Sequence, residues 1–425
     1  MISPLFPPLA DPEAHCGGKF VRGLLDARVD VSVIYCSDVR TPLRLDDSPV
    51  WKRVQAVSSD VPNPPSVPFL KRCMNAVRYQ SACWADWSRA TLSKTKQLHQ
   101  QMPFDLIISR SMPRQAQLAG FWAARALRIP WIAVLNDPWD FSPFLSNGHV
   151  EGKWSPGFNW SFWWRRIVAR ADRLCFPSER LRDACLAGSA RKSGVLILPH
   201  IGATHSGPRA VDEFLIVHAG RLGINEPTGR SPIALLDALA ELFRTRPAAK
   251  SRTRLLLVGE EDPETFQQLA ARGLSGQVFS TGWVSYTRSL DYIGQAAVCV
   301  LVEGDFQEGV FLPSKLCDYI AARKPVLAFS PQVGTVADLS AAGGIRRVGP
   351  KDSAAAAAAL IALFDAFLKS RLDAEAPPES LVKRFESRRV ITDFLTSLRS
   401  LSVKTKCQRV PDGGGARHAL DANHS

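Results

Sequence analysis

The sequence predicts an α/β protein of two Rossmann-like domains, residues 1–199 and 200–385, that face each other across a cleft. Three observations lead to this prediction. In each half, short apolar segments bounded by turn residues alternate with segments of helical periodicity, which is typical of a parallel sheet covered by helices on both faces. A stretch rich in Pro, Gly and His, 199–208, separates the halves. Charge also divides unevenly, because residues 1–200 hold 26 basic and 16 acidic side chains, whereas residues 201–400 hold 23 and 22.

The elements of the first half follow from its apolar and β-branched segments. Strands are expected at 29–35, 105–109, 129–135, 174–176 and 195–198, and helices at 19–27 and 114–127. One further strand is expected before the first helix. Only Ile2 and Ser3 precede Pro4, so that strand is unusually short.

The second half repeats the same alternation more clearly. Strands are expected at 214–218, 254–258, 277–280, 297–302 and 325–329, and helices at 231–243, 316–322 and around the Ala-rich run 354–359. A C-terminal helix over 386–400 can cross back to the first domain. The GGG and polar residues of 401–425 predict a disordered tail.

Composition excludes several classes of protein. The nine Cys are scattered without a CxxC pair, which argues against a zinc site or a disulfide framework and for a reducing compartment. No apolar run approaches the roughly 18 residues that span a bilayer, and the first residues lack the pattern of a signal peptide. We therefore expect a soluble, cytoplasmic protein, with peripheral contact at the inner membrane face as an option.

Ligands bind Rossmann-like sheets beyond the carboxyl ends of the strands, so we searched those positions for chemistry. Gly17 and Gly18 follow the expected first strand and precede the expected helix. Glycines there let backbone N–H groups approach a diphosphate at the helix N-terminus. A plain tight turn is the alternative interpretation.

Two arginines follow the first strand of the second half. Arg221 comes directly after it, and Arg230 precedes the next helix, for which Ser231 is the expected N-cap and Pro232 the first residue. Guanidinium groups stay protonated and donate bidentate hydrogen bonds, which suits a leaving diphosphate. Surface ion pairs are the alternative.

Residues 303–330 hold the densest group of candidate residues. Glu303, Asp305 and Glu308 occupy a loop after a buried strand. Ser314 and Lys315 open a helix whose first N–H groups can hold an anion, and Asp318 lies one turn further on. Together they predict a nucleotide-sugar pocket. The alternative is that Ser314 only caps the helix and Asp318 only solvates it.

Five segments of the second half resemble the retaining GT-B glycosyltransferases of family 4, in that family's order and spacing. They are HAGRL (218–222), LLLVGE (255–260), VFSTGWV (278–284), LPSKLCDYIAARKPVLA (312–328) and AAGG (341–344). The likeness covers about residues 200–385 strongly and residues 1–199 more loosely. It is greatest to bacterial members that build surface polysaccharides or glycolipids.

The resemblance implies a role for each matching residue. Arg221 would neutralise the donor diphosphate, and Asp318 would meet the donor ribose. Asp137, in the segment IPWIAVLNDPW, would lie near the reacting sugar as the main catalytic candidate of the first half. The remaining donor-binding positions are Gly17 and Gly18 on the diphosphate, Gly259, Glu260, Gly282, Trp283 and Val284 around the base, and Ser314, Lys315 and Leu316 on the phosphates.

The sequence departs from the family pattern at two places. The family usually has a Lys six residues after the first Arg, where this chain has Pro227, so Arg230 is the substitute candidate. The family also has two Glu separated by seven residues. Asp318 fits the second place, but Glu308 lies ten residues before it, so Glu308 is the predicted donor-sugar carboxylate with Glu303 and Asp305 as competitors.

The implied chemistry is front-face displacement with retention, in which the leaving phosphate helps to deprotonate the acceptor hydroxyl. No DxD pair that would hold a metal-bound diphosphate is present, and arginine, lysine and helix termini can stabilise the leaving group electrostatically. We therefore expect a metal-independent, hexosyltransferase-like enzyme that needs no cofactor beyond its nucleotide-sugar substrate.

The basic, Trp-rich first half suggests its partners. On a helical wheel Trp160, Trp163 and Ile167 share one face and Arg165, Arg166 and Arg170 the other, which suits a helix on an anionic membrane. A core-facing amphipathic helix is the alternative. No nucleic-acid module is recognisable, so we expect no nucleic-acid partner.

These observations predict an enzyme that transfers a sugar from a nucleotide-sugar donor to a glycan or polyprenyl-linked acceptor. The missing Lys and the displaced Glu leave open a catalytically silent partner subunit of a glycan-assembly complex. Epimerisation of a nucleotide sugar is a third possibility. The donor base, the sugar and the acceptor linkage stay open.

Overall fold

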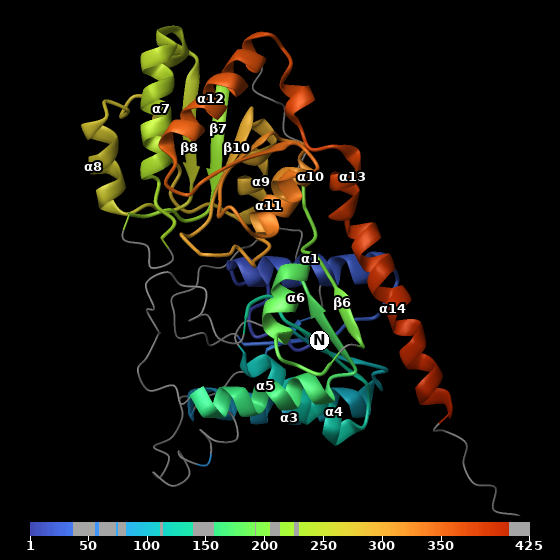
Figure 1. Ribbon diagram of the computed structural model, residues 1–425. Coiled ribbons are helices and arrows are strands. Elements are labelled where there is room, and N and C mark those ends of the chain that lie inside the picture. The colour runs from blue at the N-terminus through green and yellow to red at the C-terminus, as the bar shows by residue number, and fades with distance from the viewer. Residues whose placement is uncertain are drawn as a thin grey trace, which may run out of the picture.

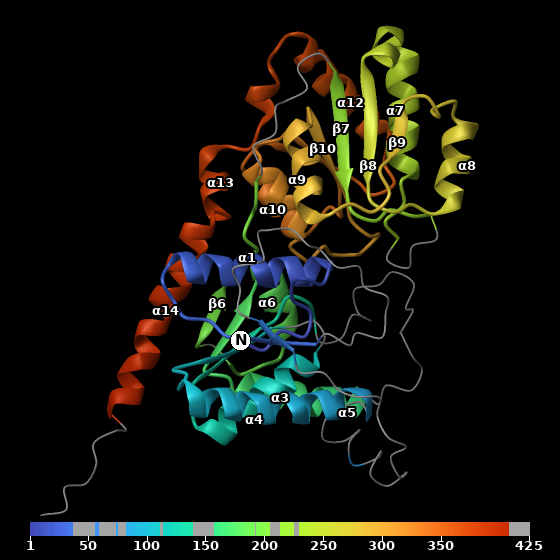
Figure 2. The same cartoon turned by 180° about the vertical axis from the view of Figure 1, so that it is seen from behind.

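The computed structural model describes residues 1–36, 56–58, 74, 82–110, 114–138, 157–191, 193–204, 213–224 and 229–407. Two α/β domains lie one above the other, and helix α1 (Pro12–Asp26) lies between their sheets in both views (Figures 1 and 2). The strand-and-helix alternation predicted for each half is confirmed. The two domains meet where the carboxyl ends of their strands face each other across α1.

The N-terminal domain is built on one parallel sheet. Its strands are β1 (Val33–Tyr35), β2 (Ala56–Ser58), β3 (Ile107–Arg110), β4 (Trp131–Val134), β5 (Arg173–Phe176) and β6 (Val195–Ile197). Its helices after α1 are α3 (Ala82–Gln101), α4 (Gln115–Leu127), α5 (Gly157–Arg170) and α6 (Glu179–Leu186).

The short first strand consists of Ile2, which pairs in parallel with both Ile34 of β1 and Ser109 of β3. Its N–H donates to the Ile108 carbonyl at 2.7 Å, and the next N–H, of Ser3, donates to the Ile34 carbonyl at 3.0 Å. The sheet order is therefore β2-β1-Ile2-β3-β4-β5-β6, because this single residue joins two groups of strands. Its order reverses direction beside Ile2, directly below α1.

The C-terminal domain has six parallel strands in the order β12-β11-β10-β7-β8-β9. They are β7 (Phe214–Ala219), β8 (Thr253–Val258), β9 (Val278–Ser280), β10 (Val298–Val302), β11 (Val326–Phe329) and β12 (Ile345–Val348). The chain winds outward in both directions from β7 and β10. The point where strand order reverses, between these two strands, is where doubly wound sheets bind ligands.

Helices cover both faces of this second sheet and bury an apolar core on each face. They are α7 (Ile233–Thr245), α8 (Pro263–Ala271), α9 (Tyr286–Gln295), α10 (Ser314–Ala321), α11 (Thr335–Ser340), α12 (Ser353–Leu368) and α13 (Glu379–Arg384). The Ala-rich run predicted as helix is the first half of α12, whose small side chains allow close packing on α7.

The last helix, α14 (Ser387–Cys407), leaves the C-terminal domain and runs along the side of the N-terminal domain (Figures 1 and 2). Phe394 of α14 packs edge-on against Phe20 of α1, with ring centroids 5.1 Å apart. Because α14 continues to Cys407, the disordered tail predicted from residue 401 is wrong for its first seven residues. Residues 408–425 lie outside the described residues.

Helix α5 packs into the N-terminal core and does not present its aromatic face to solvent. Trp163 and Ile167 are buried, and the Trp163 ring packs edge-on against Phe121 of α4 at 5.8 Å. The membrane-facing interpretation of this apolar face is therefore wrong, and the core-facing alternative is correct. The Trp160 side chain lies outside the described residues. Within the described part of the chain, no helix is both long and apolar enough to cross a membrane.

Candidate active site

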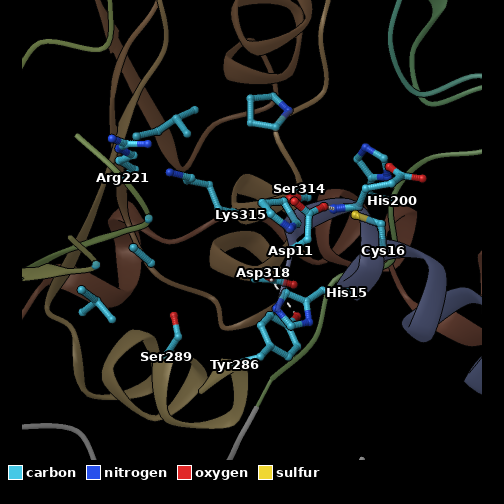
Figure 3. A pocket seen from close by; sticks show the side chains of 18 of the residues that line it. Asp11, His15, Cys16, His200, Arg221, Tyr286, Ser289, Ser314, Lys315 and Asp318 are labelled. Carbon is cyan, nitrogen blue, oxygen red and sulfur yellow. Dashed lines mark hydrogen bonds between the residues drawn. The ribbon is translucent and has the colours of Figure 1, made fainter. Parts of the chain in front are cut away.

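A cavity of about 700 Å³ opens between the two domains (Figure 3). The C-terminal domain contributes the ends of β7, β8 and β10, the segment between β9 and α9, and the start of α10. The N-terminal domain contributes the first two turns of α1, the segment after β4 and His200. The cavity therefore lies at the strand-order reversal of both sheets, as the two-domain prediction requires.

Three cations from the C-terminal domain line the cavity: Arg221, Arg230 and Lys315. Arg221 and Lys315 lie next to each other in Figure 3. The Lys315 ammonium lies over the end of β7, so that a Cβ added to Gly220 would be only 2.5 Å from Nζ. Gly220 also has a φ of +108°, which other residues rarely adopt. The backbone conformation therefore favours glycine here, and a larger residue would also displace the end of the flexible Lys315 side chain.

Helix α10 directs an open N-terminus at these cations. Its N-cap is Pro313, which makes no side-chain cap hydrogen bond, and its first helical residue is Ser314. The first N–H groups of a helix lack intrahelical acceptors and carry partial positive charge, so they favour an anion. Helix α7, which follows Arg230, begins one residue later than predicted. Its N-cap is Pro232 and its first residue is Ile233, whose N–H donates to the Ser231 hydroxyl at 3.4 Å.

The predicted base-binding residues form one side of the cavity, with exceptions. Gly259, Glu260, Trp283 and Val284 line it. A Cβ on Gly259 would lie 2.8 Å from the Gly220 carbonyl oxygen, so this glycine allows two adjacent strand ends to approach. Gly282 is not among the lining residues, and Leu316 is fully buried in the core beneath α10. Neither residue lines the cavity.

Of the three candidate carboxylates after β10, the structure brings only Glu303 to the cavity. Its side chain is buried and accepts a hydrogen bond from the Ser330 hydroxyl at 2.5 Å. Burial raises the pKa of Glu303 to about 7, although Ser330 and Arg230 oppose this shift.

The prediction of Glu308 as the donor-sugar carboxylate is wrong, because the loop turns its side chain outward. Glu308 is half exposed and pairs with Arg180 of α6 at 2.6 Å. Asp305 also points away from the cavity lining and pairs with Lys351 at 2.5 Å.

Asp318 lines the cavity but is already engaged by the opposite domain. Its Oδ1 accepts hydrogen bonds from Lys19 Nζ and from the Ala203 N–H, both at 2.8 Å, and its Oδ2 accepts one from the Tyr286 hydroxyl at 3.1 Å. The Lys19 and Asp318 side chains are only 5% and 6% exposed. Although burial lowers it, the charge of Asp318 raises the pKa of Lys19 well above its usual value, so the Lys19 ammonium stays protonated.

A stacked pair of rings continues this contact between the domains. His15 of α1 lies over Tyr286 of α9, with centroids 4.5 Å apart and planes tilted by 16° (Figure 3). The hydroxyl of Tyr286 in turn donates to Asp318. Residues of α1 are thus joined to the start of α9 and to α10 across the cavity floor.

Asp137 follows β4 and faces the cavity from the N-terminal domain. Among the described residues it has no hydrogen bond or ion pair. Burial raises its pKa to about 6; the nearby Asp11 adds to this shift, whereas His200, Arg114 and Arg230 oppose it. His200 is itself kept neutral, because burial lowers its pKa to about 3. Asp137 therefore remains available for a substrate group.

Gly17 and Gly18 do not form a phosphate-binding turn. Helix α1 begins at Pro12 and not at residue 19, so both glycines lie inside it and are buried. Neither is among the residues that line the cavity. The prediction is wrong because Asp11, Pro12 and Glu13 already form a complete helix start: the Glu13 N–H donates to Asp11 Oδ1 at 2.8 Å, and proline is favoured in the first turn.

Sequence reasoning also missed several lining residues. Asp11, Glu13, His15 and Cys16 face the cavity because α1 starts earlier than predicted. The Asp-Pro-Glu signal for a helix start could have identified them. Tyr286 and His200 carry no such local signal, because only the approach of the two domains brings them to the same cavity.

Comparisons with known proteins support the architecture. Residues 18–200 match the family model of the glycosyl transferase 4-like domain. HepE from Anabaena, solved in complex with UDP and glucose, is similar in structure with a TM-score of 0.65 and 15% sequence identity, over 95% of this chain and 99% of that chain. The chain has the GT-B fold.

Two further structural neighbours are named for different reactions. Sucrose-phosphate synthase from Thermosynechococcus elongatus has a TM-score of 0.58 at 16% identity, over 96% of this chain and 99% of that chain. A putative UDP-N-acetylglucosamine 2-epimerase from Listeria monocytogenes has a TM-score of 0.60 at 12% identity, over 95% and 96%. No curated protein matches the sequence. The family match and the GT-B neighbours support a glycosyltransferase.

Proposed function

We propose that this chain transfers a sugar, with retention of configuration, from a UDP-sugar to a glycan or polyprenyl-linked acceptor in the synthesis of a cell-surface polysaccharide or glycolipid. The observation that carries the proposal is the convergence of Arg221, Lys315 and the open N-terminus of α10 on one wall of the cavity. A leaving diphosphate needs such an arrangement of fixed positive charge. The UDP complexes of HepE support uridine as the base.

Lys315 fills the role left open by Pro227. Its ammonium lies beside Gly220, directly at the carboxyl end of the strand that precedes Arg221. Two permanent cations and the helix N-terminus then neutralise a diphosphate without a bound metal, so the proposed reaction is metal-independent. Arg230 approaches from the start of α7 and Glu303 from β10, where the donor sugar would lie.

In the proposed reaction the acceptor oxygen attacks the anomeric carbon from the face that the diphosphate leaves. The bond from the anomeric carbon to the phosphate oxygen breaks and the bond to the acceptor oxygen forms. The acceptor proton passes to the departing phosphate oxygen, so no protein nucleophile is required. Asp137 and Glu303 line the sugar's position and orient its hydroxyl groups.

The catalytically silent alternative requires a cleft that cannot hold a donor. The cavity of about 700 Å³ has the size of a small-ligand pocket and keeps Arg221, Lys315 and Glu303 on its walls. Both features favour the enzyme. A nucleotide-sugar epimerase would have the same fold as the proposed glycosyltransferase. The two activities are distinguished by the product that forms.

A thermal-shift screen against UDP-, GDP-, ADP- and dTDP-sugars tests the proposal. At 100 times Kd a ligand of the folded state adds about 2.7 kcal/mol of stability, so a true donor raises Tm measurably. The same screen on Arg221→Ala is expected to lose the shift, whereas Arg244→Ala, whose side chain is exposed on α7 beside Glu241, keeps it.

Turnover of the nucleotide sugar that binds then separates the three functions. Release of UDP, with the sugar transferred or hydrolysed, is the expected result. Binding without any turnover would identify the silent subunit, and a nucleotide-linked epimer as the product would identify the epimerase. No binding by any nucleotide sugar would contradict the proposal.

Membrane contact is proposed for the face of α5 that points away from the core. Arg165, Arg166 and Arg170 are exposed on α5, and this helix lies at the end of the N-terminal domain away from the C-terminal domain (Figure 1). Exposed cations attract anionic lipid, and salt screens this attraction. Replacing all three by Ala is expected to abolish binding to anionic vesicles at low salt, and unchanged binding would contradict this proposal.

A further inference from the structure

We propose that the N-terminal wall of the cavity excludes anionic groups, so that the transferred sugar is uncharged or carries an amine and is not a uronate or a phosphorylated sugar. This inference rests on the proposed function, because the diphosphate on the C-terminal wall directs the sugar toward the N-terminal wall. It names the chemical class of donor that the sequence left open.

The only helix N-terminus that the N-terminal domain directs into the cavity is occupied by the protein's own carboxylates, among the residues the structure describes. Asp11 caps α1 and accepts the Glu13 N–H at 2.8 Å. Glu13 follows in the first turn. A helix N-terminus favours an anion, but here that preference is already satisfied within the chain. A substrate anion would therefore meet carboxylates and not free N–H groups.

The cations near this wall are also committed. Arg110 is buried behind the wall, with its Nε 2.9 Å from Glu13 Oε1. Lys19 is bound to Asp318 of the other domain. Within the described part of residues 1–200, Lys19 is the only Lys or Arg that lines the cavity. Among the described residues 1–200, this wall therefore contributes no uncommitted Lys or Arg, and the guanidinium that acts on Asp137 from inside the cavity, Arg230, belongs to the C-terminal domain.

Asp137 and Asp11 complete the wall. Asp137 makes no hydrogen bond or ion pair with a described residue, the nearby His200 is neutral, and Arg114 and Arg230 act on Asp137 only through longer-range attraction. The neutral amide of Asn136 is likewise occupied, since it donates to both Glu13 oxygens at 2.7 and 2.5 Å. Carboxylates accept hydrogen bonds from sugar hydroxyl or ammonium groups and repel carboxylate and phosphate groups.

The wall contrasts with the domain that carries it. Residues 1–200 have ten more basic than acidic side chains. Three of these cations, Arg165, Arg166 and Arg170, belong to α5, which lies at the end of the N-terminal domain away from the C-terminal domain (Figures 1 and 2).

The test compares two donors that differ only at C6, UDP-glucose and UDP-glucuronate, with UDP as the reference. Calorimetric titration is expected to give a Kd for UDP-glucuronate about 100-fold weaker than for UDP-glucose. If another base binds, its own matched pair, such as GDP-mannose and GDP-mannuronate, takes their place. The double variant Asp11→Asn with Asp137→Asn is expected to bind UDP-glucuronate more tightly, so that the ratio of the two Kd values falls about tenfold. Asparagine still caps α1, so the helix start is kept.

Asp183→Asn is the matched control, because Asp183 is an exposed carboxylate of α6 paired with Arg182 and does not line the cavity. It is expected to leave the ratio unchanged. If the nucleotide binds but the uronate binds as tightly as the neutral sugar, or if the double variant leaves the ratio unchanged, this inference is overturned and the proposed function stands. If no nucleotide binds at all, the proposed function fails first.

Discussion

Lys19 and Asp318 are 299 residues apart in sequence, yet Lys19 Nζ lies 2.8 Å from Asp318 Oδ1 in a buried ion pair that joins the two domains. Asp318 is the residue proposed to meet the donor ribose. Its Oδ1 is bound by Lys19 and by the Ala203 N–H, whereas Oδ2 accepts one hydrogen bond from the described residues, that of the Tyr286 hydroxyl. A ribose hydroxyl would therefore approach Oδ2, with Lys19 and the Ala203 N–H fixing the orientation of the carboxylate.

Removing Lys19 is expected to destabilise the protein strongly. Lys19→Met leaves the buried Asp318 charge without its ion-pair partner, and the loss of one partner of such a pair costs about 3–5 kcal/mol. Urea unfolding measures the change. Arg22→Met is the control on the same helix, because Arg22 is exposed and pairs with Asp26 in a surface contact worth about 1 kcal/mol at most. Equal effects from both variants would contradict the structural role of the ion pair.

Gly220→Ala is expected to weaken nucleotide binding at least tenfold. The added Cβ would lie 2.5 Å from Lys315 Nζ and would displace the ammonium from the end of β7. Gly273→Ala is the matched control, because Gly273 also has a positive φ but no atom within 4 Å of its Cβ position. Gly273→Ala introduces backbone strain of about 1–3 kcal/mol but does not displace the Lys315 ammonium. If both variants bound the nucleotide as the parent does, Lys315 would not be part of the site.

Glu303→Gln is expected to change how stability depends on pH. Burial raises the pKa of the folded-state carboxyl to about 7 from 4.5, so the unfolded chain loses this proton first as the pH rises. The parent therefore loses stability between pH 4.5 and 7, by up to about 3 kcal/mol, and the glutamine variant does not. Denaturant titrations at pH 4 and pH 8 measure this. The free energy of unfolding of the variant, relative to that of the parent, should be larger at pH 8 than at pH 4. An equal difference at both pH values would contradict the raised pKa of Glu303.

The α14 contact with α1 is expected to stabilise the N-terminal domain. Phe394 is buried against Phe20, so Phe394→Ala removes an aromatic side chain from the core at a cost of about 3–5 kcal/mol. Asp393→Ala, one residue earlier, removes only an exposed pair with Arg389 and should change the free energy of unfolding by less than about 1 kcal/mol. Indistinguishable urea midpoints would show that α14 does not hold the domain.

Local patterns in the sequence predicted most of the fold. The strands around β7, β10 and β11 are continuous apolar segments, and their parallel pairing follows from the helices between them. Ile2 shows the limit of this reasoning, because one residue has no periodicity and becomes a strand only through its pairing with β1 and β3. Asp11 and Pro12 signal the start of α1, but Gly17 and Gly18 equally suit a turn, and no local pattern decides whether the helix contains the two glycines or follows them.

The candidate site was predicted in part. Arg221, Lys315 and Asp318 were found because each follows a strand or opens a helix, which fixes its position at the sheet edge. Spacing could not choose between Glu303 and Glu308, because the loop between them decides which side chain turns inward. Contacts between the domains, such as His15 with Tyr286, depend on how the two domains approach and leave no local pattern.

The central claim is that Arg221 and Lys315 bind a nucleotide diphosphate in the cavity between the domains. Calorimetric titration with UDP and with uridine, which lacks the diphosphate, tests it most directly. The expected result is that UDP binds at least 100-fold more tightly than uridine to the parent, and that Arg221→Ala with Lys315→Ala removes most of this difference. Equal affinities of the parent for UDP and uridine, or a difference that survives in the double variant, would contradict the claim.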